Sequence, residues 1–143
     1  MLRVRHLLAR KGNDTWTVEA EEPVLEAIQI MADRQVGALP VLRDGKLVGI
    51  VSERDYARKV ILLGRSSAET LVWQIMSSPA VTVPPEEEIR RCMEIMTERR
   101  IRHLPVVDAS GAMIGVISIG DLVHAVIEEQ QETIQQLEKF IVG

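Results

Sequence analysis

The chain has 143 residues, of which 46% are hydrophobic and 27% charged, a composition that excludes a disordered chain and fits one folded domain. Aromatic residues make up 3% of the sequence and the net charge is −4, so neither base stacking nor binding to a phosphate backbone is favoured. The single cysteine, Cys92, excludes an internal disulfide and fits a reducing compartment, for which we expect the cytoplasm.

The chain begins with a basic segment, residues 1–11, that contains no acidic residue. It lacks the long apolar stretch and the small-residue cleavage site of a signal peptide. A mitochondrial transit peptide and a short amphipathic helix both fit this segment. We favour the helix, because serine is absent there and the folded domain begins almost at once. No apolar run of the sequence is long enough to cross a membrane.

The rest of the sequence is one unit written twice. The Leu-Pro-Val sequence at 39–41 matches the one at 104–106, and the match continues, after one extra residue in the second copy, to a Gly-x-x-Ser-x-x-Asp sequence at 49–55 and 115–121. Agreement at such a consistent spacing indicates an internal duplication.

Each copy predicts a strand, a helix, two strands and a second helix. The first copy predicts, in this order, a strand at 15–18, a helix with apolar positions Val24, Ala27, Ile28 and Met31, strands at 38–42 and 47–51, and a helix that begins at Ser52. The second copy predicts a strand at 80–83, a helix with apolar positions Ile89, Cys92, Met93 and Met96, strands at 103–107 and 113–117, and a helix that begins at Ser118. A serine with an acid three residues later is typical of a capping box.

The fold class predicted is therefore α/β (α+β), with two β-α-β-β-α repeats. One unit is too small to cover its sheet, so we expect the two units to pack face to face by their sheets around a common core. The expected boundaries are an N-terminal helical lead-in at 1–14, the first repeat at 15–62, a linker and lead-in helix at 63–78, the second repeat at 79–128, and a C-terminal helix extension at 129–143.

From Trp16 to Ile127 the chain resembles a tandem pair of CBS domains, also called a Bateman module, and in particular small stand-alone bacterial CBS-domain proteins. The repeated Leu-Pro-Val strand and Gly-x-x-Ser-x-x-Asp corner carry this resemblance. The resemblance implies two repeats packed sheet to sheet with pseudo-twofold symmetry. It also implies two clefts that bind adenosine-containing ligands such as AMP, ADP, ATP, NAD or S-adenosylmethionine.

The resemblance assigns residues of this sequence to each cleft. In one cleft, Ser52 and Asp55 would hold ribose and phosphate, and in the other Ser118 and Asp121 would hold ribose, because a carboxylate accepts hydrogen bonds from both ribose hydroxyls. The first cleft would have Val51, Ala80, Val81, Ile101 and Arg102 around the base, and Arg54 and His103 at the phosphate. The second would have Ile117, Thr15, Trp16, Val36, Gly37 and Ala38 around the base, with Arg102 near the phosphate.

The two corners differ in charge. The first contains Glu53 and Arg54 where the second contains Ile119 and Gly120, so the second lacks a cation. We therefore expect stronger phosphate binding at the Asp55 cleft, unless Arg3, His6 or Lys11 serves the other. A plainer interpretation stays open, in which the two aspartates only stabilise helix starts and Arg54, Arg102 and His103 are exposed surface charges.

The last helix extends beyond the repeats with an apolar stripe of Ile127, Ile134, Leu137 and Ile141. The stripe either docks onto the chain's own core or packs on another subunit, and we favour a homodimer, as in related modules. His6, His103 and His124 show no metal-ligand spacing, and no nucleophile signature or phosphate-binding glycine loop is present, so no catalytic residue and no metal is expected.

The sequence thus predicts a non-catalytic regulatory module that senses an adenine nucleotide (AMP, ADP, ATP or NAD) and transmits binding to a dimer surface or to an unknown regulated protein. The alternatives are a protein-interaction or structural dimer module without a nucleotide, and an S-adenosylmethionine sensor. An enzyme is poorly supported. No nucleic acid or membrane is expected as a partner.

Overall fold

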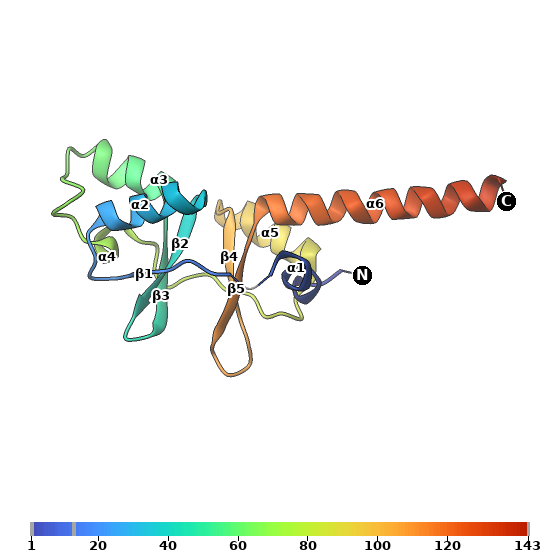
Figure 1. Ribbon diagram of the computed structural model, residues 1–143, viewed down its shortest axis with the longest axis horizontal. Helices are drawn as coiled ribbons and strands as arrows, with labels where there is room; N and C mark the ends of the chain where they lie inside the picture. Colours follow the sequence, from blue (N-terminus) through green and yellow to red (C-terminus); the bar gives the residue numbers. More distant parts are fainter. Residues whose placement is uncertain (1, 13, 143) are drawn as a thin grey trace.

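The computed structural model describes residues 2–12 and 14–142, which form a mixed α+β fold with two small sheets (Figure 1). In chain order the elements are α1 (Val4–Lys11), β1 (Val18–Glu19), α2 (Val24–Arg34), β2 (Ala38–Arg43), β3 (Lys46–Ser52), α3 (Glu53–Tyr56), a π-helical turn η1 (Ala57–Ile61), α4 (Val72–Ile75), α5 (Ile89–Arg99), β4 (His103–Val107), β5 (Met113–Ser118) and α6 (Ile119–Val142). The fold class and the repeated order of elements are as predicted.

Both halves have the same strand pairing. The hairpin β2–β3 pairs antiparallel and so does β4–β5, and β1 adds a parallel strand to β2 through Val18 and Val41. In the second half the corresponding contact is a single parallel bridge between Val83 and Val106. The expected strand at 80–83 is reduced to this bridge because the two prolines that follow it have no N–H group with which to continue a ladder.

The buried side chains form two clusters, one in each half, and not the common core expected from the sequence. The lead-in helices explain the difference, because each packs onto the opposite half. Val4 and Leu7 of α1 are buried in the core of the second half, and Val72 and Ile75 of α4 are buried in the core of the first. Figure 1 shows α1 beside β5 and α4 beside the first sheet. The chain therefore crosses between the halves at both lead-ins, which holds the two units together.

The two hairpins lie beside each other in the middle of the molecule, and residues from the starts of β2 and β4 share cavities between them (Figure 1). From these hairpins α6 runs outward as one continuous helix. Every described residue from 129 to 142 is exposed, so the last part of α6 projects away from both cores. Among the described residues, no helix combines the length and apolar character needed to span a membrane.

Candidate functional site

The Ser-x-x-Asp corner of the first half is a reciprocal helix cap. The backbone N–H of Ser52 donates to Oδ2 of Asp55 at 2.9 Å, and the backbone N–H of Asp55 donates to Oγ of Ser52 at 3.2 Å. The capping box predicted from the sequence is confirmed. Lys59, one turn along, lies with Nζ 3.5 Å from Oδ1 of Asp55 and donates to the carbonyl of Ile75. The cap therefore fixes the Asp55 side chain at the junction between β3 and α3.

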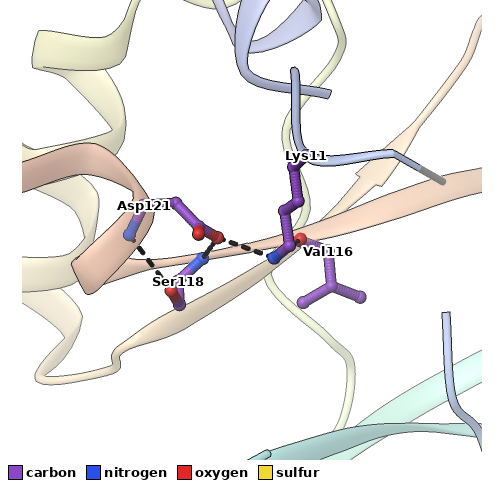
Figure 2. A network of polar contacts seen from close by, with 4 residues as sticks. All are labelled: Lys11, Val116, Ser118 and Asp121. Carbon is purple, nitrogen blue, oxygen red and sulfur yellow. Dashed lines mark hydrogen bonds and ion pairs between the residues drawn. The ribbon is translucent and has the colours of Figure 1, made fainter. Parts of the chain in front are cut away.

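The second corner repeats this cap, with the Ser118 N–H donating to Oδ2 of Asp121 at 2.8 Å and the Asp121 N–H donating to Oγ of Ser118 at 3.2 Å. Its surroundings differ, as Figure 2 shows, because Lys11 reaches in from the end of α1. Nζ of Lys11 lies 2.6 Å from Oδ2 of Asp121 and donates to the carbonyl of Val116 at 2.7 Å. Burial raises the pKa of Asp121, but hydrogen bonds from Lys11 and Ser118 outweigh it, and the pKa lies below its usual value.

A cavity of about 410 Å³, which we name the Asp55 cleft, opens between the two halves. Six of the residues assigned to the first cleft line it together: Ser52, Arg54, Asp55, Ile101, Arg102 and His103. Arg58, Arg99 and Arg100 also line it. The concentration of arginines at 99, 100 and 102 was the signal in the sequence that could have revealed Arg99 and Arg100.

Four residues assigned to the base pockets do not line the clefts, and strand geometry explains two of them. Side chains alternate between the faces of a strand, so that Ser52 faces the cleft while its neighbour Val51 points into the first core and is 1% exposed. Ile117 is fully buried in the second core in the same way. Ala80 and Val81 are not among the residues that line the Asp55 cleft, and Val81 packs against the second core.

A second cavity of about 400 Å³, which we name the Trp16 cleft, gathers six residues of the second assignment: Thr15, Trp16, Val36, Gly37, Ala38 and Ser118. Asp121 is not part of this lining. It faces a neighbouring cavity of about 340 Å³ between α1 and α6, while Lys11 lines both. Arg102 lies in the Asp55 cleft instead, and the guanidinium of Arg34 stacks 3.9 Å from the ring centroid of Trp16.

His103 lies between the two clefts and lines both, as do Gly37 and Ala38 at the start of β2. Burial lowers the pKa of His103, the positive charges of Lys11 and Arg102 lower it further, and Asp121 opposes them. The imidazole is therefore neutral at physiological pH. A group that borders both cavities provides a direct physical connection between them.

The two clefts differ sharply in charge. The Asp55 cleft is lined by five arginines, against the carboxylates of Glu53 and Asp55. The Trp16 cleft is lined by one lysine and one aspartate, Lys11 and Asp14, and its other lining residues are uncharged. Arginine binds phosphate and carboxylate groups through paired hydrogen bonds, so the first cleft is suited to an anion and the second is not.

Comparison with known proteins is consistent with this architecture. The CBS-domain model matches residues 4–61 and 72–128, ranges that include α1 and α4. The chain is 45% identical over 137 residues to the mitochondrial CBS domain-containing protein CBSX3 of Arabidopsis thaliana, covering 92% of this chain and 66% of that protein. The chain thus spans slightly less than two thirds of this relative's length.

Solved structures share the fold. A CBS-domain protein of Burkholderia ambifaria superposes with a TM-score of 0.86 at 45% identity, covering 90% of this chain and 96% of that one. The CBS domain pair of protein MJ0100, in complex with 5′-methylthioadenosine and S-adenosyl-L-methionine, superposes with a TM-score of 0.79 at 22% identity, covering 90% and 98% of the two chains. The chain belongs to the CBS-domain family, and two CBS domains in tandem make up most of it.

Proposed function

We propose that this protein is a regulatory module that binds an adenosine ligand carrying phosphate groups (AMP, ADP, ATP or NAD) in the Asp55 cleft. The observation that supports it is the convergence, in one cavity between the two halves, of the Asp55 carboxylate with five arginines. Tandem CBS-domain proteins are typically regulatory modules without catalytic activity, so we propose no chemical step for this one.

Each part of such a ligand has a counterpart in the cleft. The Asp55 side chain is 16% exposed and held by its cap, so it presents an ordered carboxylate to the ribose hydroxyls. Ile101 and Ala38 offer apolar surface to the adenine ring. Arg54 and Arg58 from the first half, with Arg99, Arg100 and Arg102 from the second, surround the space for phosphates.

The charge of the cleft separates this proposal from the S-adenosylmethionine alternative. MJ0100 shows that the fold holds adenosine compounds that carry no phosphate. S-adenosylmethionine carries a sulfonium, an ammonium and a carboxylate, so its net charge is positive and five arginines would repel it. A nucleotide brings two to four negative charges instead. The arrangement therefore favours a nucleotide.

Isothermal titration with AMP, ADP, ATP, NAD and S-adenosylmethionine tests the proposal. We expect at least one of the phosphate-bearing ligands to bind, S-adenosylmethionine to bind more weakly, and Asp55→Ala to remove the binding. Absence of binding by all five ligands, or unchanged binding by the folded Asp55→Ala protein, would contradict the proposal and favour an interaction module without a nucleotide.

We infer further that the signal passes through a homodimer formed by α6. Its exposed apolar residues Val123, Ile127, Ile134, Leu137 and Ile141 follow the alternating four-and-three spacing of a coiled-coil seam, in which the polar Gln130 occupies one position. The acidic residues of this part of the helix, Glu128, Glu129, Glu132 and Glu138, all fall outside the seam positions, so two copies bring no like charges into contact at those positions. The first seam position is isoleucine at 127, 134 and 141, and the second is Val123, Gln130 and Leu137; isoleucine at the first position with leucine at the second is the combination that favours two parallel helices.

Binding in the Asp55 cleft touches both halves, because its lining comes from α3 and from the turn before β4. A ligand there would favour one relative arrangement of the halves over others. Since α6 leaves directly from the second half, a change in that arrangement alters the direction of α6 and hence the dimer.

The expected cytoplasmic location remains a prediction, and the Arabidopsis relative is named a mitochondrial protein.

A further inference from the structure

The end of α1 is placed at the second Ser-x-x-Asp corner, where no sequence motif required it. α1 belongs to the N-terminal segment, yet its last residue, Lys11, is held by two acceptors of the second half, the Asp121 carboxylate and the Val116 carbonyl (Figure 2). Both contacts have hydrogen-bond lengths, 2.6 and 2.7 Å. An ammonium group has three N–H donors, so two of them are committed to this corner.

We propose that Lys11 is a built-in occupant of the second adenosine site: its ammonium group takes the place on the Asp121 carboxylate that ribose hydroxyls would take, so the chain binds one adenosine ligand and not two. This inference rests on the proposed function, and it assigns Lys11 as the residue that determines how many ligands the pair accepts.

The shape of the cavities supports this role. Asp55 lines the same cavity as the residues assigned to its base pocket, whereas Asp121 does not line the Trp16 cleft. Lys11 lines both the Trp16 cleft and the neighbouring cavity that contains Asp121. The lysine side chain therefore stands between the carboxylate and the pocket that would hold the base.

The two halves also neutralise their aspartates from different directions. Asp55 is approached by Lys59 of its own helix, and Lys59 is not part of the cleft lining, so the carboxylate keeps a free side toward the cavity. The repeat places Ala125 at the position of Lys59, so the second helix supplies no such cation. Asp121 receives its cation, Lys11, from α1 instead, and Lys11 also lines the Trp16 cleft.

A different role for Lys11 makes the opposite prediction. If the ammonium served as a phosphate ligand of the second cleft, the wild-type protein would bind two nucleotides and loss of the lysine would weaken one of them. If Lys11 blocks the site, the wild type binds one and loss of the lysine adds another. The number of bound ligands per chain separates the two.

The experiment measures the stoichiometry of adenosine binding by isothermal titration for the wild type, Lys11→Met and Lys11→Met with Asp121→Ala. Adenosine is the probe because it carries no phosphate, and the Trp16 cleft is not suited to an anion. We expect one adenosine per chain in the wild type, two in Lys11→Met and one again in the double variant. Arg10→Met is the matched control, because Arg10 precedes Lys11 on α1 and pairs with Glu128 away from the Trp16 cleft. It is expected to bind one ligand.

Two ligands in the wild type, or no additional ligand in Lys11→Met, would overturn the inference while leaving the proposed binding in the Asp55 cleft intact. If the wild type binds nothing while Lys11→Met binds one ligand that Asp121→Ala abolishes, the proposed use of the Asp55 cleft fails and the role of Lys11 stands. Should Lys11→Met not fold, as judged by circular dichroism, Lys11→Gln takes its place, since its amide can still donate to Val116.

Discussion

A Cβ atom at Gly115 would lie 2.6 Å from Cδ2 of Leu8, so the end of α1 rests directly on β5. The matching glycine of the first sheet, Gly49, is equally crowded, with a Cβ position 2.6 Å from the carbonyl oxygen of Ser77 and 2.7 Å from Sδ of Met76. In each half the glycine lets the segment that enters from the lead-in helix approach the sheet. The crossing of the chain between the halves depends on these two positions.

Alanine at Gly49 is therefore expected to destabilise the protein by about 1–3 kcal/mol, the usual cost of overpacking, and more than alanine at Gly115. The obstacle at Gly49 includes a backbone oxygen, whereas the obstacle at Gly115 is the end of a leucine side chain that can rotate. Urea unfolding measures both. Gly120→Ala is the control, because its Cβ would lie 3.6 Å from the Ser118 hydroxyl, an ordinary contact. Equal stability of Gly49→Ala and wild type would contradict this account of the packing.

The arginines of the Asp55 cleft lead to a prediction about which part of the ligand they bind. Replacing Arg99 and Arg100 by alanine should weaken ATP binding by about tenfold or more, since hydrogen bonds to charged groups contribute about 1.5–3 kcal/mol each. The affinity for adenosine, which has no phosphate, should change little. Arg43→Ala is the control, because Arg43 pairs with Glu21 outside the cleft. Competition titrations with both ligands give the comparison, and an equal loss for adenosine would show that these arginines do not contact phosphate.

The proposed dimer predicts that a charge within the seam of α6 separates the subunits. Leu137→Asp places a carboxylate against the partner helix, where burial of an unpaired charge is costly, and should give a monomer. Gln136→Asp introduces the same charge one position away, outside the seam, and should leave the dimer intact. Light scattering coupled to size exclusion measures the mass of each. A dimer that survives Leu137→Asp would mean that the subunits associate elsewhere or that α6 binds another partner.

The sequence predicted the repeated topology, the helix caps and six residues of the Asp55 cleft, because these depend on local patterns and on motifs that the duplication presents twice. Periodicity placed the helices, and the Ser52 and Ser118 caps follow from side chains three residues apart. The separate cores could not be inferred in this way, and the sequence offered Lys11 only as one of three candidate cations for the second cleft, without its contact with Asp121. Both depend on α1 packing against a sheet about a hundred residues away, and no local pattern encodes which half a lead-in helix joins.

The position of His103 between the two clefts gives a prediction about pH. Burial and the charges of Lys11 and Arg102 hold the pKa of His103 below its ordinary value of 6.5, against the opposing charge of Asp121. The unfolded chain has the ordinary pKa and the folded protein has the lowered one. At a pH between the two, the unfolded chain binds more protons than the folded protein, so stability decreases as the pH falls below 6.5.

His103→Gln removes this titration and should reduce the loss of stability between about pH 7.5 and pH 5.5, as measured by urea unfolding at both values. His124→Gln is the control, since the His124 side chain is 75% exposed and borders neither the Asp55 cleft nor the Trp16 cleft. Lys11→Met should also reduce the pH dependence, because it takes away one of the charges that lower the pKa of His103. If His103→Gln and wild type lose the same stability on acidification, the histidine is not held neutral by its position between the clefts.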